Sequence, residues 1–256
     1  MSKVRNLIWF LKRPHLMPQV WYLFQRKFRP AIVAMDATGE ESLRWCRERE
    51  VDMATAFRKL TGQEAPVPVR ERFGEVFATS EQVTEACVVR MGGPGAVDML
   101  YWICEFLQAK SVIETGVAYG WSSLAILLSL RNRPGARLVS VDMPYVGMNN
   151  DEYVGCAVPE SLRGPWTLSK TSDRQGIPRG LRQLGAIDIC HYDSDKSYQG
   201  RMWAYPILWQ ALRGGGIFVS DDINDNVAFR DFCAGMKIGP VIFSVHGKFV
   251  GMMTKP

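Results

Sequence analysis

Long apolar runs are absent from this 256-residue sequence. No stretch approaches the roughly 18 consecutive apolar residues that a membrane-spanning helix requires. The apolar run at residues 7–11 is too short for the core of a signal peptide, and Lys12, Arg13 and Pro14 follow it. We therefore expect a cytoplasmic protein without a cleaved leader. With 47% apolar and 22% charged residues, the composition is typical of a globular chain that buries one proper core.

Paired cysteines are lacking as well. The six cysteines are scattered, with no C-x-x-C spacing and no histidine at a ligand-like distance from them. This pattern favours reduced thiols in the cytosol and gives no sign of a structural zinc site. A G-x-S-x-G motif is also missing, which argues against a serine hydrolase of that class.

Acidic residues are missing from the first 35 positions. This segment has seven Lys or Arg residues among its aromatic side chains, and the whole chain has a net charge of +5. Residues 36–256 therefore carry a net charge of −2, which argues against nucleic acid as a partner. A basic, aromatic segment can lie on an anionic membrane surface, although Pro14 and Pro18 interrupt any long amphipathic face. The alternatives are an arm that packs on the body of the protein and an arm that pairs the subunits of a homo-oligomer.

The sequence does contain a strand, a glycine turn and a helix start at residues 111–123, SVIETGVAYGWSS. The short apolar run at residues 112–113 predicts a buried strand, and residues 121–130 predict a helix. Gly116 and Gly120 lie between them, as in a nucleotide site at the switch point of a parallel sheet, where a ligand approaches the backbone. The G-x-x-x-G spacing lacks the third glycine of a dinucleotide site, so it suits a ligand without a pyrophosphate.

Strands and helices alternate along the rest of the chain, which predicts an α/β fold with a doubly wound, mostly parallel sheet in three layers. The further strands are expected at residues 137–141, 166–170, 187–192 and 217–219, with a C-terminal hairpin. The helices are expected at residues 39–62, 80–89 (with Ser80 as its cap), 96–108 and 204–212, with a glycine turn at 214–216. Residues 143–165 predict a loop with at most one short helical turn, in the place of a substrate lid; Tyr145, Met148 and Tyr153 are its candidates for the acceptor pocket. We expect a helical N-terminal extension at residues 1–87 and the main domain at residues 88–256.

Acidic residues follow three of the expected strands. Asp142 ends the second strand, where a carboxylate can accept hydrogen bonds from a ribose diol. Asp193 follows the fourth strand, and Asp221 and Asp222 follow the fifth. Since these two strands are neighbours in a doubly wound sheet, the three carboxylates meet in one cleft and repel one another unless a cation lies among them. Oxygen ligands of this kind suit Mg²⁺, with Ca²⁺ and Mn²⁺ as alternatives.

Three motifs resemble those of the class I S-adenosylmethionine-dependent methyltransferases: E-x-G-x-x-x-G at residues 114–120, IDICHYDSDKSYQG at 187–200 and GGGIFVSDDINDN at 214–226. The last two are similar to the cation-dependent O-methyltransferases of catechols and caffeoyl thioesters, and to bacterial macrolide-sugar and cephalosporin-type relatives. The resemblance covers roughly residues 88–256 and implies a seven-stranded Rossmann-like sheet that ends in an antiparallel strand. It also implies S-adenosylmethionine as methyl donor and a hydroxyl of a small molecule or sugar as acceptor, in natural-product or glycan biosynthesis.

The resemblance assigns roles to individual residues. The implied cofactor-binding residues are Glu114, Gly116, Tyr119, Gly120, Ser122, Asp142, Ser172, Asp173 and, from the segment that covers the cofactor, Met91. Asp193, Asp221 and Asp222 are the implied metal ligands, and Asp222 stands where the family usually has asparagine. Lys196 and Asp193 are the implied catalytic residues, with His191 as the alternative base. A metal would lower the pKa of the acceptor hydroxyl, and the lysine would take its proton or stabilise the alkoxide.

Two other functions stay open. An NAD-dependent oxidoreductase would account for the glycines and for Asp142, but not for the G-x-x-x-G spacing or for the acids after the fourth and fifth strands. A non-catalytic, membrane-associated scaffold with the methyltransferase fold would account for the basic N-terminus.

Overall fold

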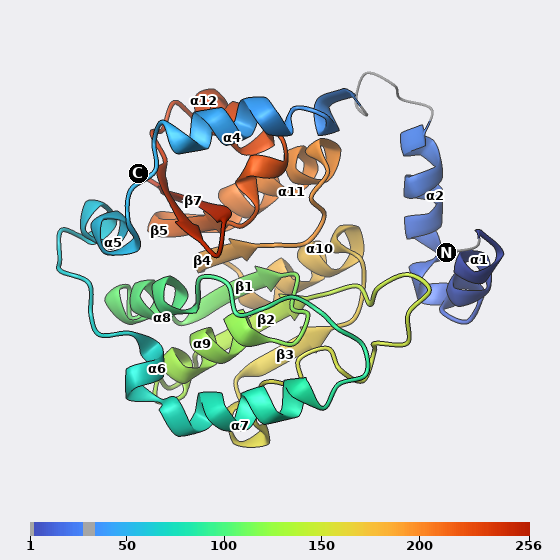
Figure 1. Ribbon diagram of the computed structural model, residues 1–256, viewed down its shortest axis with the longest axis horizontal. Coiled ribbons are helices and arrows are strands. Elements are labelled where there is room, and N and C mark those ends of the chain that lie inside the picture. Colours follow the sequence, from blue (N-terminus) through green and yellow to red (C-terminus); the bar gives the residue numbers. More distant parts are fainter. Residues whose placement is uncertain (1–2, 28–33) are drawn as a thin grey trace.

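The computed structural model describes residues 3–27 and 34–256, and at its centre is a seven-stranded sheet with helices on both faces (Figure 1). The strand order is β3-β2-β1-β4-β5-β7-β6. Strands β1 to β5 run parallel, and β7 is antiparallel to both β5 and β6. The strands are β1 (Ser111–Thr115), β2 (Arg137–Val141), β3 (Trp166–Ser169), β4 (Ile187–Tyr192), β5 (Leu212–Ser220), β6 (Val241–Val245) and β7 (Lys248–Thr254). The order reverses between β1 and β4, which makes this the switch point where such sheets bind ligands.

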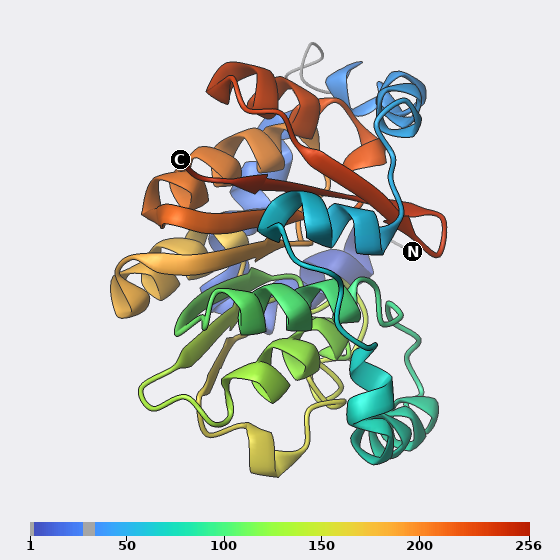
Figure 2. The same ribbon diagram turned by 90° about the vertical axis from the view of Figure 1, so that its left-hand side faces the viewer.

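Two hydrophobic cores lie on the two faces of the sheet, because successive residues of a strand point in opposite directions. Val112 and Leu138 pack on one face, whereas Ile113 and Val139 pack on the other. The first face is covered by α5 (Met53–Thr61), α8 (Val97–Phe106) and α9 (Trp121–Leu130), and the second by α10 (Asp173–Leu184), α11 (Tyr198–Ala211) and α12 (Ala228–Met236). In Figure 2, α5 lies in front of the C-terminal hairpin. The doubly wound, three-layer class I methyltransferase architecture is therefore confirmed.

The helices before residue 88 pack on this body. They are α4 (Gly39–Arg47), α5, α6 (Val69–Arg72) and α7 (Gly74–Glu85). The Val51 N–H donates to the carbonyl of Ile242 in β6 (2.9 Å), and the ring of Phe77 stacks on Trp121 with centroids 6.1 Å apart. The division between residues 87 and 88 stays a prediction, and both sides of it contribute to one hydrophobic core.

Several elements have the expected bounds, including the helix at residues 121–130 and the strands at 137–141 and 187–192. The prediction of one helix at residues 39–62 is wrong, because Asp52 caps a second helix by accepting a hydrogen bond from the Thr55 N–H (2.8 Å).

The expected starts of two helices are also wrong. The helix predicted from Ser80 begins at Gly74, and Ser80 lies within it, where its hydroxyl donates to the Ala157 carbonyl (2.6 Å). Helix α11 begins at Tyr198 instead of residue 204, since Ser197 caps it by accepting from the Gly200 N–H (3.0 Å).

The glycines at 214–216 belong to β5 instead of forming a turn, and a register shift in β4 between Ile187 and Ile189 accommodates them. The loop at residues 143–165 contains one short helical element, η2 (Glu160–Leu162), as expected. The cysteines of the described residues are all free.

An N-terminal arm consists of α1 (Lys3–Leu11), η1 (Pro14–Leu16) and α2 (Met17–Lys27) (Figure 1). Pro14 interrupts the helix, whereas Pro18 lies in the first turn of α2, where proline is tolerated. Trp9, Phe10 and Leu16 are buried against the loop that follows β2. The described part of the arm therefore packs on the body, and none of the helices within residues 3–27 and 34–256 is long and apolar enough to span a bilayer.

Candidate active site

A cavity of about 770 Å³ opens at the carboxyl ends of the parallel strands. Its floor includes Gly116 after β1, Asp142 after β2, Asp193 after β4 and Asp221 after β5. The walls come from residues 92–96, from α2, from the starts of α10 and α11, and from the turn between β6 and β7. Asp142, Asp193 and Asp221, which follow different strands in the sequence, therefore share one space, whereas Asp222 does not line it.

The two glycines of the first loop are required by close contacts within the protein. Gly116 has φ = 77°, and a Cβ added to it would lie 2.1 Å from the carbonyl oxygen of Asp193. Gly120 has φ = 94°, and its Cβ would lie 3.1 Å from Gly155 Cα in the loop after β2. Gly116 thus lets the ends of β1 and β4 meet at the switch point, and Gly120 lets the lid loop pack on α9. The sequence argument had given a ligand as the reason for both.

Two carboxylates with raised pKa values, the buried Asp142 and the half-buried Asp173, line the cavity. Asp142 Oδ2 accepts a hydrogen bond from the Ala118 N–H (2.9 Å), and burial raises the pKa of Asp142 to about 7. Asp173 Oδ2 accepts from the Ser194 hydroxyl (2.6 Å), and burial raises the pKa of Asp173 to about 6. Both line the cavity together with Ser122 and Ser172, so four of the predicted cofactor residues besides Gly116 come together.

Glu114 lies beneath the cavity in a buried polar chain. Its Oε2 accepts hydrogen bonds from the hydroxyls of Ser123 (2.5 Å) and Ser140 (2.6 Å). Its Oε1 lies 3.6 Å from Nδ1 of His191, whose Nε2 lies 3.7 Å from Oδ2 of Asp221. Burial alone would lower the pKa of His191, but the carboxylates of Asp221 and Glu114 together raise it to about 10. His191 also lines the cavity, and the two carboxylates on either side of it favour its protonated form.

The carboxylates after β4 and β5 differ in their surroundings. Burial and the neighbouring Asp221 raise the pKa of Asp193. The Oδ1 atoms of Asp193 and Asp221 are buried and have no hydrogen-bond partner among the described residues. Asp193 Oδ1 does lie 3.4 Å from Lys196 Nζ, an ion-pair distance without hydrogen-bond geometry.

Asp222 is bound by protein cations. It forms an ion pair with Lys196, and its carboxylate lies 3.2 Å from Nζ of Lys248. It has φ = 52°, a left-handed conformation that turns it out of the cavity lining. Across residues 3–27 and 34–256, no group of three or more His, Cys, Asp or Glu side chains is arranged to hold a metal ion.

Lys196, the predicted catalytic lysine, lines the cavity, whereas Tyr119 and Met91 lie outside its lining. Tyr119 donates its hydroxyl to the Val89 carbonyl (2.9 Å), and Met91 Sδ accepts from the Asn150 amide (3.3 Å). Both residues join the cofactor-covering segment to the rest of the protein. Tyr145 of the lid loop lines the cavity, whereas Met148 and Tyr153 do not.

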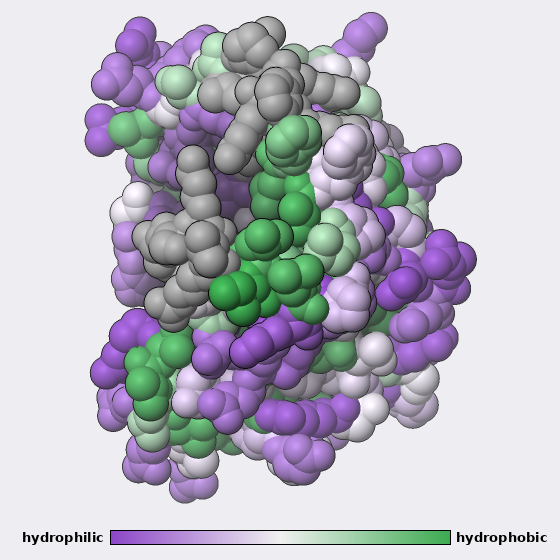
Figure 3. Space-filling view, turned by 90° about the vertical axis from the view of Figure 1, so that its right-hand side faces the viewer, coloured by the Kyte–Doolittle hydropathy of each residue, from purple (hydrophilic) through white to green (hydrophobic). Residues whose placement is uncertain are grey.

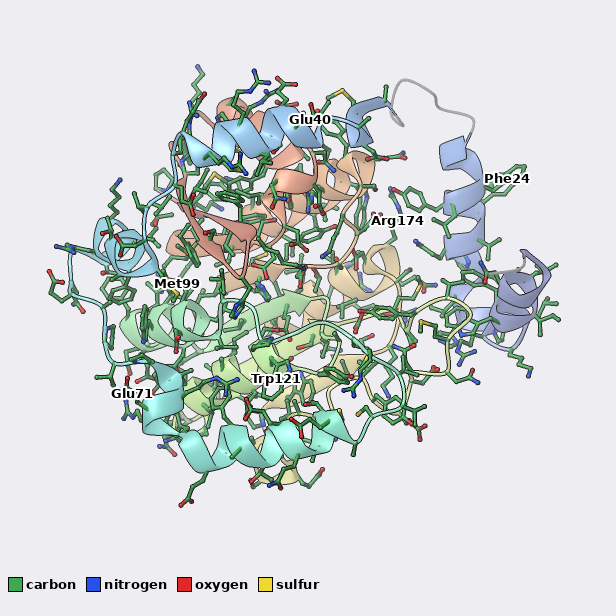
Figure 4. The ribbon with its side chains drawn as sticks, in the orientation of Figure 1. Phe24, Glu40, Glu71, Met99, Trp121 and Arg174 are labelled. Carbon is green, nitrogen blue, oxygen red and sulfur yellow. The ribbon has the colours of Figure 1, made fainter. Side chains whose placement is uncertain are left out.

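Several residues that line the cavity are not indicated by any motif in the sequence. They are Gln19, Tyr22 and Leu23 of the arm, Arg174 and Trp203 on α10 and α11, and Val245, His246 and Lys248 at the hairpin. Arg174 lies over the ring of Tyr22 at 4.1 Å and over that of Trp203 at 4.6 Å, and Figure 4 shows it between α10 and α2. The Gly-Gly-Pro-Gly run at residues 92–95 belongs to the segment that was expected to cover the cofactor, and it lines the cavity.

Known proteins that resemble this chain are methyltransferases. Residues 113–223 match a family model described as a methyltransferase domain. No curated protein matches the chain. Among solved structures, an O-methyltransferase from Bacillus cereus in complex with SAH has a TM-score of 0.55 at 13% identity, covering 74% of this chain and 93% of its own. The O-methyltransferase TomG from Streptomyces achromogenes, involved in tomaymycin synthesis and in complex with SAM, has a TM-score of 0.55 at 16% identity, covering 73% and 96%.

A putative caffeoyl-CoA O-methyltransferase from Staphylococcus aureus has a TM-score of 0.51 at 10% identity, covering 73% of this chain and 95% of its own. At these identities the likeness is one of fold. The predicted antiparallel C-terminal strand, which is β7 between β5 and β6, and the glycine-containing turn between β1 and α9 agree with it. Residues 113–223 therefore match a methyltransferase domain, and the chain has the fold of the O-methyltransferases solved with SAH or SAM.

Proposed function

We propose that this protein transfers a methyl group from S-adenosylmethionine to a hydroxyl of a small molecule or sugar, in natural-product or glycan biosynthesis. The observation that carries the proposal is that Asp142 and Asp173 line the same cavity as Asp193 and Asp221. The first pair suits the hydroxyls and amine of a nucleoside. The second pair provides negative charge next to the place where a positively charged donor or a metal would be bound.

For methyl transfer, the protein mainly has to align the acceptor oxygen with the methyl group and to place charges around them. As the acceptor oxygen forms its bond to the methyl carbon, the carbon–sulfur bond breaks and the sulfonium charge is lost. Lys196 is paired with Asp193 and Asp222, so its first role is to stabilise negative charge on the acceptor oxygen. To accept the hydroxyl proton, Lys196 would first have to give its own proton to water.

We further propose that Asp193 and Asp221 hold a divalent cation, most naturally Mg²⁺. Support comes from their Oδ1 atoms, which are buried and without hydrogen-bond partners in the described chain. A buried carboxylate oxygen without a hydrogen bond is costly, and a cation that prefers oxygen ligands would contact both Oδ1 atoms at once. Bound there, the ion would lower the pKa of the acceptor hydroxyl. Asp222 becomes a third ligand only if Lys196 and Lys248 release it.

Calorimetry with S-adenosylhomocysteine and with NADH tests the choice of ligand. We expect S-adenosylhomocysteine to bind and NADH not to bind. Asp142→Ala should lower the affinity for S-adenosylhomocysteine at least about 10-fold, because the contact with the ribose is lost. Glu160→Gln is the matched control, because the Glu160 side chain is 90% exposed and distant from the cavity wall. Binding of NADH alone would favour the oxidoreductase.

Methyl transfer to a panel of hydroxyl acceptors, with and without a chelator, tests the metal. We expect the chelator to abolish transfer and Mg²⁺ to raise the melting temperature of the wild type but not of Asp193→Asn. If the chelator leaves methyl transfer unchanged, the proposed metal is overturned and the proposed methyltransferase activity stands.

The arm leads to two further proposals about partners. Contact of residues 1–35 with a membrane surface is supported by the absence of acidic residues from this segment. Pairing of subunits through the arm is its competitor, and a cytoplasmic location remains a prediction.

A further inference from the structure

The arm uses one side of its helices to hold the body. Trp9 Nε1 donates to the Met148 carbonyl (2.9 Å), and Arg13 forms two hydrogen bonds with the carboxylate of Asp151 (3.2 and 2.6 Å). Gln175 of α10 donates to the carbonyl of His15 (2.8 Å). The arm is thus tied both to the lid loop and to the helix that begins at the donor cavity.

The inner side of α2 closes the cavity next to the predicted nucleoside residues. Gln19, Tyr22 and Leu23 line it, and the guanidinium of Arg174 lies over the rings of both Tyr22 and Trp203. Arg174 directly follows Asp173 in the chain. A change in how firmly the arm is held on the body therefore acts on the end of the cavity where the donor nucleoside would bind.

The outer side of the same helices is apolar and exposed. Six of the eleven exposed large apolar side chains of the described residues lie in the arm: Leu7 (51%), Ile8 (48%), Leu11 (62%), Met17 (38%), Trp21 (62%) and Phe24 (52%). The rings of Trp21 and Phe24 stack with centroids 5.9 Å apart, and Figure 4 shows Phe24 directed away from the body. On the face where α1 and α2 lie, Figure 3 shows an apolar patch bordered by hydrophilic residues. We call these six side chains the outer patch.

Charge decides which occupant fits the outer patch. The segment that carries it has seven Lys or Arg residues and no Asp or Glu up to residue 35. Two arms facing each other in a dimer would bring two such segments together without a compensating acid. An anionic bilayer instead offers negative headgroups for the cations and an acyl boundary for Trp, Phe and Leu side chains, as amphipathic helices in the membrane interface require.

We propose that the outer patch docks on an anionic bilayer, and that docking and methyl-donor binding strengthen each other because the inner side of the same arm closes the donor cavity. The second half rests on the proposed methyltransferase function. Linkage requires the effect to be reciprocal: the factor by which vesicles raise the affinity for the donor product equals the factor by which that product raises the affinity for vesicles.

Flotation of the full chain with vesicles tests the docking. Vesicles of phosphatidylcholine with phosphatidylglycerol should bind the wild type, and pure phosphatidylcholine vesicles should not. Leu11→Ser/Trp21→Ser should lower the affinity for the anionic vesicles at least about 10-fold, since it removes two of the most exposed apolar side chains of the outer patch. Val67→Ser/Val88→Ser is the matched control, because these valines are 60% and 84% exposed and lie outside the arm.

S-adenosylhomocysteine titrations with and without anionic vesicles test the linkage. We expect vesicles to tighten binding by about 5-fold or more in the wild type. Tyr22→Ala should keep vesicle binding and reduce this factor toward one, because the outer patch is intact while the contact over Arg174 is lost.

Each contrary outcome overturns a defined part of the proposal. Absence of vesicle binding, or equal binding to neutral vesicles, overturns the docking. A dimer in light scattering that becomes a monomer in Leu11→Ser/Trp21→Ser identifies a second copy as the occupant. Vesicle binding that S-adenosylhomocysteine leaves unchanged, in a protein that binds S-adenosylhomocysteine, overturns the linkage. Failure to bind S-adenosylhomocysteine at all overturns the proposed function and leaves the flotation result valid.

Discussion

At the scale of single residues, the site depends on charges that compensate one another out of contact with water. His191 is 2% exposed and lies between Glu114 and Asp221, so it supplies a positive charge that two carboxylates need. Removal of one partner of such a group leaves a buried charge unpaired, which is more costly than replacement of the whole group.

His191→Gln should therefore lower the free energy of unfolding by about 3–5 kcal/mol, because Glu114 and Asp221 keep their charges without the imidazolium. The double variant Glu114→Gln/His191→Gln should lose less unfolding free energy than the two single variants together, because it removes the charges of both partners and leaves neither of them unpaired. Urea denaturation of the four proteins in this cycle measures the coupling. Strict additivity would mean that the two side chains do not interact.

The affinity for S-adenosylhomocysteine should depend on the protonation of Asp142. Burial raises the pKa of Asp142 to about 7, and only its ionised form can accept hydrogen bonds from both ribose hydroxyls. We expect affinity to fall by up to about 10-fold per pH unit below pH 7, and Asp142→Asn to remove the dependence. Calorimetry between pH 5.5 and 8 measures both, and a flat wild-type profile would contradict the role of Asp142.

The same shift has a consequence for the ligand-free protein. The pKa of Asp142 in the folded protein lies above its ordinary value of 3.8, so the folded state binds the proton more tightly than the unfolded state. The contribution of Asp142 to stability is fully present below about pH 4 and is lost as the pH rises through about 7. Added S-adenosylhomocysteine should oppose that loss.

At the scale of elements, the contact between the loops after β1 and β4 fixes the switch point. Gly116→Ala would place a Cβ 2.1 Å from a backbone oxygen and also strain a left-handed φ. Gly135→Ala has the same kind of φ (75°) but open space around its Cβ. We expect about 1 kcal/mol of destabilisation for Gly135→Ala and at least about twice that for Gly116→Ala, as measured by urea denaturation. Equal effects would contradict the backbone contact.

Elements were predictable where one local signal dominated. The strand at residues 137–141 is an apolar run that ends in an acid, and the helix at 121–130 begins after a glycine, so their bounds could be read correctly. Helix α7 was misplaced because Ser80 carries the signal of an N-cap, yet its hydroxyl donates to Ala157 in the lid loop. That partner is 77 residues away, and no local pattern indicates it.

The same distinction between local and long-range signals applies to the residues of the site. The acids after β2, β4 and β5 could be predicted, because topology alone brings the ends of parallel strands together. The contact of Tyr22 with Arg174 depends on how the arm packs, and nothing in either local sequence indicates it. The ion pair of Asp222 with Lys196 is also a matter of backbone conformation, since φ = 52° at Asp222 directs its side chain.

At the scale of the whole molecule, α5, α6 and α7 share one hydrophobic core with α8 and α9. Phe57 of α5 is 1% exposed and makes edge-to-face contacts with Trp102 and Phe106 of α8, with centroids 5.7 and 6.3 Å apart. Phe77 of α7 stacks on Trp121 at the start of α9, next to the cavity. A helical layer held in this way stabilises the helices that carry the glycine loop.

Phe57→Ala should therefore destabilise the whole protein, by about 3–5 kcal/mol, instead of releasing the N-terminal helices alone. Residues on both sides of the division between 87 and 88 should unfold together. The urea-unfolding curves measured by far-UV circular dichroism and by tryptophan fluorescence should therefore coincide, in the wild type and in the variant. Val83→Ala is the control, because Val83 is 42% exposed on α7 and its substitution should lower the free energy of unfolding only slightly. Two separate transitions would mean that residues 34–87 unfold on their own, and that the shared core is too weak to make the catalytic domain depend on them.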